Sequence, residues 1–384
     1  MATAEHTVKE MDSRWFDFLR AQGLALAGAF LFAAVVGGLI IIAYGENPLD
    51  VYLTVWRFST ARPQDFAQVL ENATPLVFSG LSVAVAFKAG LFNIGAEGQY
   101  IVGMMTASVA ALTLDFLPGI LLLPAVILAG MVGGMVWAWV PAVLRVKTGA
   151  HEVVTTIMMN GIAVSLVAWV LLNPLRSSER ELVDLRTDIF TPKAKVPNLA
   201  SSLGFEDVVP PSVQLTWLFP LAVLTCAVVW FILFRTRLGY EVRAVGSSSG
   251  SAEAGGVSIG ATQIKIFLLS GALAGLVGLN HLIGDKGYLG NNYVTGLGFA
   301  GIAVAFLGRN HPGGVLLSAI LIGMLTRGQD GIDITTELPT EILIILQGLL
   351  ILSVVIAYEV VNRVLTKRRA GAAPGPTPTG AGAG

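Results

Sequence analysis

The chain has 384 residues, of which 54% are hydrophobic and only 13% are charged, and its mean hydropathy is +0.73. Soluble globular proteins carry about 25% charged residues, so this composition excludes an ordinary water-soluble domain and indicates a membrane protein. The net charge of −1 gives no sign of a nucleic-acid partner, and the single cysteine, Cys226, excludes an intramolecular disulfide.

Apolar runs between glycine, proline and charged residues predict ten membrane-spanning helices. The predicted ranges are 23–43, 74–87, 97–114, 118–144, 153–172, 215–234, 263–283, 297–307, 313–325 and 342–361. The second, eighth and ninth ranges are short, so we expect them to be tilted, broken or covered by protein. The expected fold class is therefore an all-α, polytopic membrane protein.

The basic residues predict the orientation of these spans. The first apolar run is too long for a signal peptide and follows a basic segment, so we expect it to be retained. With a cytoplasmic N-terminus and ten crossings, 15 Lys and Arg residues lie inside and 9 outside, five of the latter in one long loop. The positive-inside rule therefore predicts that both termini are cytoplasmic.

This orientation divides the chain into a cytoplasmic segment 1–22, a transmembrane domain 23–363 and a cytoplasmic tail 364–384. From Ala370 onward the tail has no residues that can build a core, and the tail is expected to be disordered. The longest external loop, 173–214, carries charges of both signs and suits either an extracytoplasmic partner or a solvated connection. The longest internal loop, 235–262, contains two stretches expected to be helical, GYEVRAVG and SAEAGGVSI.

Motifs for chemistry are missing from the sequence. No lysine follows a glycine, so no G-x-x-x-x-G-K-[ST] phosphate loop is present. The histidines lack metal-binding spacing, and acidic residues lie mainly in loops and at span ends, with Glu97 and Glu152 the nearest to exceptions. We therefore predict that the chain has no catalytic residue, no metal and no cofactor of its own.

Two G-x-x-x-G pairs, Gly130 with Gly134 and Gly271 with Gly275, predict close helix packing within the subunit.

A polar internal loop with two short helices, in a chain without a nucleotide site, is typical of a docking element for a separate ATPase. The loop resembles the G-x-x-x-R-A-V-G signature of permease subunits of ABC importers for ribose, other simple sugars and nucleosides. By this resemblance, the residues expected to couple to the ATPase are Gly239, Glu241, Arg243, Ala244, Gly246, Ala252 and Gly256. For Glu241 and Arg243 the alternative is a solvated pair on the loop. Ser247 or Ser248 stands where the signature usually has asparagine.

Three further segments resemble the same family in the same order. GLFNIGAEGQYIVGMM (90–105) is similar to the segment that marks the nucleoside branch, whereas the sugar branch more often carries a G-G-I-D-L-S-V-G version. HEVVTTIMMNGIA (151–163) and GLGFAGIAVAFLGRNHPGG (296–314) resemble the fifth span and the eighth-span hairpin of that branch. The shared spacing G-L-x-x-x-G at Gly90 and Gly296 is consistent with broken helices in two inverted-repeat halves.

A path for a neutral polar solute needs hydrogen-bonding side chains and an aromatic face without a fixed charge. The candidates for this path are Asn93, Gln99, Thr156, Asn160 and Phe299. Each of the polar candidates could instead bond a neighbouring helix, and Glu97 could cap the N-terminus of the third span.

The resemblance implies a non-catalytic permease subunit of a nucleoside importer in the bacterial inner membrane. It also implies the partners: ABC ATPase subunits that use ATP, a second permease subunit or another copy of the chain, and an extracytoplasmic substrate-binding lipoprotein. One alternative is a permease for ribose or another simple sugar, which the NIGAEGQ segment disfavours. An alternative of another class is an ion-coupled secondary carrier, which would need no ATPase.

Overall fold

The computed structural model describes residues 27–178, 185–336, 338–339 and 341–371, and these residues are mostly helical, as predicted. After a helix at 27–43, the elements are α2 (Pro48–Thr60), α3 (Pro63–Lys88), α4 (Ala96–Thr113), α5 (Gly119–Thr148), α6 (Glu152–Leu172), a 3₁₀ turn η1 (Pro192–Ala194), α7 (Leu199–Leu203), α8 (Leu218–Arg235), α9 (Arg237–Ser247), α10 (Ser249–Ala254), α11 (Ile259–Ala274), a π-helical turn η2 (Asn280–Lys286), α12 (Leu297–Leu307), α13 (Pro312–Thr335) and α14 (Glu341–Gly371). The N-terminal segment 1–22 and the end of the tail lie outside the described residues.

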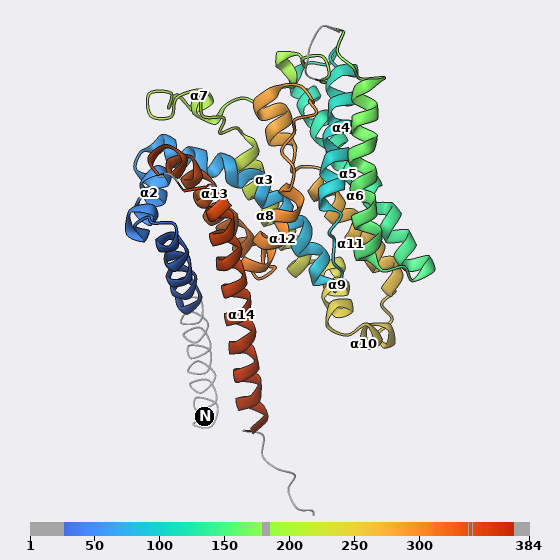
Figure 1. The fold of residues 1–384 in the computed structure, drawn as a ribbon. Helices are drawn as coiled ribbons and strands as arrows, with labels where there is room; N and C mark the ends of the chain where they lie inside the picture. The colour runs from blue at the N-terminus through green and yellow to red at the C-terminus, as the bar shows by residue number, and fades with distance from the viewer. Residues whose placement is uncertain (1–26, 179–184, 337, 340, 372–384) are drawn as a thin grey trace, which may run out of the picture. The chain divides into compact units, whose positions relative to one another are not determined.

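The chain forms two compact units, one of residues 52–337 and one of residues 1–51 with 338–384. Within the first unit, α9 and α10 lie at one end and α7 lies at the opposite end (Figure 1). α8 runs between them, from just after the long loop 173–214 to α9. The two loops that the sequence assigns to opposite sides of a membrane thus lie at opposite ends of this unit.

Five helices in the described part of the chain are long and apolar enough to cross a membrane: α3, α5, α6, α8 and α13. A sixth span is possible if residues 27–43 and α2 act as one bent pair, and α11, α12 and Ile344–Ala357 are shorter apolar helices. All ten predicted ranges overlap helices, while the number of crossings and the sidedness of the termini stay predictions. The chain is a multi-pass membrane protein.

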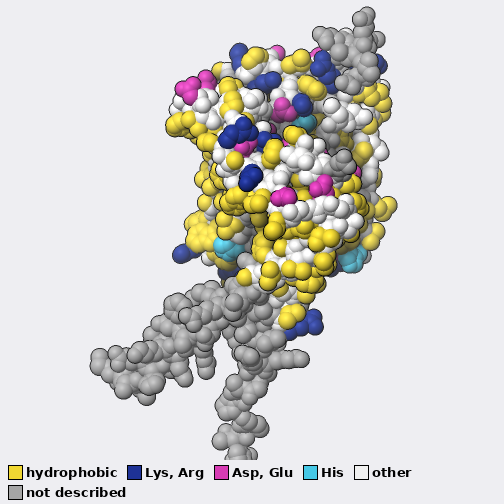
Figure 2. Space-filling view, turned by 60° about the vertical axis from the view of Figure 1, so that its left-hand side comes forward, with side chains coloured by type: hydrophobic (Ala, Val, Ile, Leu, Met, Phe, Trp, Pro, Cys, Tyr) yellow, Lys and Arg dark blue, Asp and Glu magenta, His cyan; other side chains and the backbone are white. Residues whose placement is uncertain are grey.

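The exposed faces of these helices are apolar. On α5, Ile120 is 82% exposed and Leu128 is 58% exposed. Figure 2 shows hydrophobic side chains over much of the lower part of one face, whereas charged side chains gather mainly in its upper part. Large exposed apolar surfaces are unfavourable in water, so these faces are suited to lipid or to another membrane subunit.

α3 is the central helix of the 52–337 unit. It packs against α8, α11, α12 and α13. Of the residues in its most apolar 18-residue stretch, 78% are buried, compared with 28% in the corresponding stretches of α5, α6 and α8. Burial on all sides explains why α3 is apolar around its circumference in its second half. The other close packing is between α5 and α11, where Gly134 meets Gly271 and Gly130 meets Gly275 without room for a Cβ atom. The predicted packing role of the two G-x-x-x-G pairs is confirmed.

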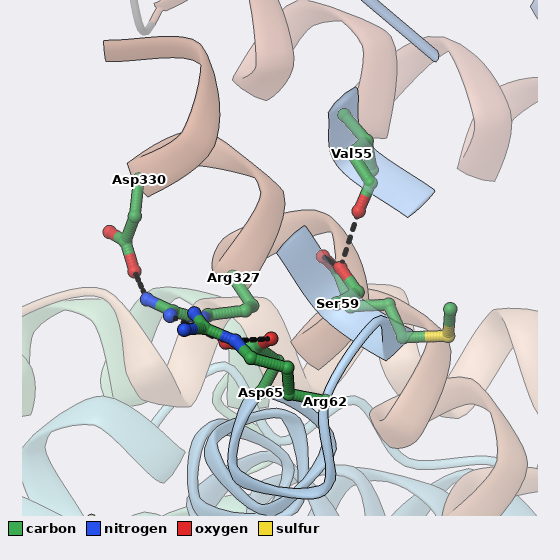
Figure 3. A network of polar contacts seen from close by, with 7 residues as sticks. Val55, Ser59, Arg62, Asp65, Arg327 and Asp330 are labelled. Carbon is green, nitrogen blue, oxygen red and sulfur yellow. Dashed lines mark hydrogen bonds and ion pairs between the residues drawn. The ribbon is translucent and has the colours of Figure 1, made fainter. Parts of the chain in front are cut away.

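The short second span was predicted wrongly. The predicted range 74–87 is only the second half of α3, which begins at Pro63. The predicted range leaves out the polar first half of the helix, which contains Asp65, yet Asp65 is 1% exposed. Its carboxylate lies between the guanidinium groups of Arg62 and Arg327, at 2.9 and 3.2 Å (Figure 3). Ion pairing therefore stabilises a buried charge that the hydropathy pattern alone disfavours.

Two other predicted boundaries change. The ninth range, 313–325, extends to Thr335 in α13, where Arg327 and Asp330 pair at 2.6 Å. The seventh range, 263–283, is not one continuous helix: α11 ends at Ala274 and the π-helical turn η2 follows at Asn280–Lys286. The interruption follows Gly275, where close packing on α5 leaves no space for a side chain.

Candidate functional site

A sharp corner joins α8 to α9. α8 ends at Arg235 and α9 begins at Arg237, and the hydroxyl of Thr236 accepts a hydrogen bond from the N–H of Gly239 at 3.3 Å. Gly239 lies directly against carbonyl groups at the end of α8, so a larger residue does not fit there. This explains in physical terms why the signature begins with glycine.

α9 is amphipathic, and its outer face is broadly exposed. Val242 and Val245 are buried against the bundle, whereas Tyr240 is 63% exposed and the side chain of Arg237 is 92% exposed. Sequence reasoning overlooked Tyr240. An aromatic residue on the polar face of a loop helix was the signal for it, since exposed tyrosines are enriched at protein interfaces.

The two charged coupling candidates have different surroundings. Arg237 donates to the carboxylate of Glu241 at 2.9 Å, and Lys265 lies 4.0 Å from the same carboxylate. With Leu238, these three residues line a pocket of about 460 Å³ between α9 and α11. Arg243 instead lies over the ring of Phe234, 5.4 Å from its centroid. Glu241 thus pairs with the exposed Arg237 and not with Arg243, and the coupling roles of Glu241 and Arg243 stay predictions.

The remaining coupling candidates lie at the end of α9 and on α10. Ala244 is half-buried, Ala252 is buried, and Gly256 is exposed in a left-handed conformation with φ +79°. α10 ends at Ala254, so the second predicted helical stretch is shorter than expected and its Ile259 begins α11 instead. The left-handed glycine turns the chain between the two helices.

Gly246, near the C-terminal end of α9, contacts the end of α3. A Cβ atom on Gly246 would collide with the carbonyl oxygen of Lys88, and a Cβ atom on Gly90 would lie 3.7 Å from Cα of Gly246. Gly90 has φ +71° and starts the non-helical segment 89–95 between α3 and α4. α9 therefore lies directly on the chain that leads into this break.

Buried amides hold the break in place. Asn93 and Gln99 form a reciprocal pair, with Nδ2 to Oε1 at 2.8 Å and Nε2 to Oδ1 at 3.0 Å. Asn93 also donates to the hydroxyl of Ser270 at 2.8 Å, and Ser270 donates to the carbonyl of Ser82 at 2.7 Å. These bonds connect the break to α11 and α3 and satisfy polar groups that are shielded from water.

The other path candidates surround the same break. Asn160 accepts from the N–H of Gly98 at 2.8 Å and donates to the carbonyl of Ile94 at 3.1 Å. Thr156 is buried and bonds within α6, to the carbonyl of Val153 at 3.1 Å. Phe299, at the start of α12, is 46% exposed. The structure thus gathers all five candidates near the N-terminus of α4, but the amides bond to helices and only Phe299 presents a large exposed surface.

Glu97 does not cap its own helix. It is 5% exposed, and its two carboxylate oxygens accept from the N–H groups of Gly296 at 2.7 Å and Gly298 at 2.9 Å. These are the first N–H groups of α12, so Glu97 of α4 caps a helix about 200 residues further along the chain. The expected cap on the third span is corrected, because a carboxylate stabilises whichever helix N-terminus lies within its reach.

The long loop 173–214 is folded against the second half of the unit over its described part. Thr187 N–H donates to Leu289 O at 2.9 Å and Phe190 N–H donates to Gly287 O at 2.7 Å. Asp188 accepts from the Ser177 hydroxyl at 2.7 Å and from the Ser178 N–H at 2.8 Å, and these bonds hold the pKa of its carboxyl below the usual range. The described part of this loop is thus held to the rest of the unit by hydrogen bonds, and its role as a partner surface or a solvated connection stays a prediction.

Comparison with known proteins places these features in a family. A family model described as the permease component of branched-chain amino acid transport systems matches residues 66–355. The chain is 32% identical to a glucose ABC transporter permease protein of Haloferax volcanii, over 84% of both chains. It is 32% identical to a guanosine ABC transporter permease protein of Bacillus subtilis, over 86% of this chain and 92% of that protein. A nucleoside ABC transporter permease protein of Lactococcus lactis subsp. cremoris is 30% identical, over 89% of this chain and 93% of the other.

The matched range contains α3 from Phe66 onward, the break with its amides, the α9–α10 elbow and the α12–α13 hairpin. Most of the chain and nearly all of its described polar interior thus lie within the matched region. This chain belongs to the family of membrane permease components of transport systems.

Proposed function

We propose that the chain is the permease subunit of an ATP-binding cassette importer that carries nucleosides across a bacterial inner membrane. ABC ATPase subunits bind at α9 and α10, an extracytoplasmic binding lipoprotein delivers the solute at the opposite end, and a second permease or another copy of this chain completes the path. The ATPase subunits hydrolyse ATP, so this chain needs no cofactor or catalytic residue.

The observation that carries this proposal is the contact of Gly246 with the end of α3. An exposed amphipathic helix lies directly on the chain that leads into a buried polar break. Movement of α9 by a docked ATPase would displace Lys88 and Gly90, and with them the segment that Asn93 and Gln99 hold. Energy from outside the chain would thereby change access to the path.

Nucleoside cargo is supported by two relatives with guanosine or nucleoside in their names and by the segment GLFNIGAEGQ. Phe299 supplies an exposed aromatic face on which a base can stack. A simple sugar is the second candidate, favoured by the glucose permease relative.

The test is reconstitution of the permease in proteoliposomes with the ABC ATPase and the binding protein of the same organism. ATP-dependent accumulation of labelled guanosine, with labelled glucose as the competing cargo, supports the proposal. Preference for glucose would replace the nucleoside with a sugar. Uptake driven by an ion gradient without an ATPase would overturn the importer and favour a secondary carrier.

A further inference from the structure

The first turn of α4 holds the start of α12. Glu97 accepts the N–H groups of Gly296 and Gly298, and the hydroxyl of Tyr100 donates to the carbonyl of Val294 at 2.5 Å. Gly298 lies so close to the backbone of Glu97 that no Cβ atom fits between them. Two helices that both begin inside the bundle therefore meet at one buried carboxylate.

The segment that leads into α12 is hydrogen-bonded to the long loop 173–214, which is called the outer loop below. Residues 283–291 are paired with the loop through backbone hydrogen bonds, including Val196 N–H to Ile283 O at 2.9 Å and Asn291 N–H to Leu185 O at 2.9 Å. Five residues after Asn291 the chain reaches Gly296, the N-cap of α12. A displacement of the loop is thus transmitted over a short distance to the N–H groups that Glu97 binds.

The segment that leads into α4 follows α3 and contacts the elbow formed by α9 and α10, which is called the inner elbow below. Gly246 of α9 lies against Lys88 and near Gly90, and the segment from Gly90 to Gly95 leads directly into the helix that carries Glu97. The amide pair of Asn93 and Gln99 ties this segment to the same first turns of α4. The two routes, from the outer loop and from the inner elbow, converge on Glu97.

We infer that Glu97 is a positioning residue that connects solute delivery at the outer loop to the ATPase elbow. This inference rests on the proposed function and assigns it a specific junction. The carboxylate is suited to the role because it accepts from two N–H groups at once and its charge is stabilised at the N-terminus of α12. A glutamine has one acceptor oxygen, and its amide group would face an N–H donor.

The test uses the complete importer in proteoliposomes, with the Glu97→Gln variant. Basal ATP hydrolysis reports docking at α9, and the stimulation of hydrolysis by guanosine-loaded binding protein reports communication through the permease. In Glu97→Gln we expect basal hydrolysis at the wild-type level, but a loss of stimulation and a fall of at least about tenfold in the maximal rate of guanosine uptake. The KM for guanosine, which the binding protein sets, is expected to stay unchanged.

Ser108→Ala is the matched control, because Ser108 is also buried on α4 but its hydroxyl bonds only to Met104 within that helix. Tyr100→Phe removes the hydroxyl that donates to Val294 and to Glu97 and keeps the ring, so it should weaken stimulation partially. Wild-type stimulation in an assembled Glu97→Gln importer would overturn the inference. So would an equal loss of basal and stimulated hydrolysis, which indicates a purely structural role. If wild-type protein gives no ATP-dependent guanosine uptake, the proposed function itself fails.

Discussion

Gly246 of α9 lies against the carbonyl oxygen of Lys88, the last residue of α3, without space for a methyl group between them. The glycine that closes the R-A-V-G sequence therefore marks a contact between two helices. This contact joins the exposed elbow of α9 and α10, at one end of the 52–337 unit, to the segment 89–95 that forms the buried break between α3 and α4.

A valine at this position should separate α9 from α3. Steric overlap of this kind costs about 1–3 kcal/mol, so Gly246→Val is expected to reduce guanosine uptake roughly tenfold or more. Uptake per assembled complex is the measurement. Gly161→Val on α6 is the control, because no atom lies within 4 Å of the corresponding Cβ position. Equal uptake in the two variants would contradict the proposed transmission through Lys88.

The amide of Asn160 supports the break between α3 and α4. Asn160→Leu leaves the N–H of Gly98 and the carbonyl of Ile94 without their partner, at a cost of about 1–3 kcal/mol for each buried group. We expect a lower maximal uptake rate with the importer still assembled. Thr155→Val, which removes a hydroxyl bonded only within α6, should leave the rate near wild type. An unchanged rate in Asn160→Leu would remove this residue from the path.

The buried carboxylate of Asp65 should contribute strongly to stability. Asp65→Asn leaves Arg327 without one of its two ion-pair partners, and breaking a buried pair costs about 3 kcal/mol or more. Thermal unfolding in detergent should therefore shift to a clearly lower midpoint. Asp330→Asn removes a partner whose side chain is 55% exposed, so its effect should be much smaller. Similar midpoints for the two variants would argue against the central role of Asp65 in the network of Figure 3.

Asp188 predicts a pH dependence in the outer loop. The Ser177 and Ser178 hydrogen bonds lower its pKa in the folded state, so its contribution to stability is complete above the unfolded value of about 3.9. This contribution is lost as the pH falls from that value through the lower, folded pKa. Protection of the loop against limited proteolysis should therefore differ between wild type and Asp188→Asn near neutral pH and converge below about pH 4. A difference that persists unchanged at lower pH would show that the carboxylate charge is not responsible.

The sequence by itself determined the membrane class, the helical fold and the position of the elbow. These properties are local: apolar runs of sufficient length predict helices in lipid, and the polar stretch around Arg243 stands out between two apolar runs. The packing role of the G-x-x-x-G pairs was equally readable, because their spacing places both glycines of a pair on one helix face.

Only the tertiary structure decided which polar groups meet. Glu97 and Gly298 are separated by 201 positions in the chain, so no spacing rule connects them. Asp65 lies outside every span predicted from the sequence, and its partner Arg327, 262 positions away, comes within 3.2 Å of it only in the folded chain. A buried polar group is tolerated only when a partner satisfies it, and that partner is set by the packing of helices rather than by its neighbours in the sequence.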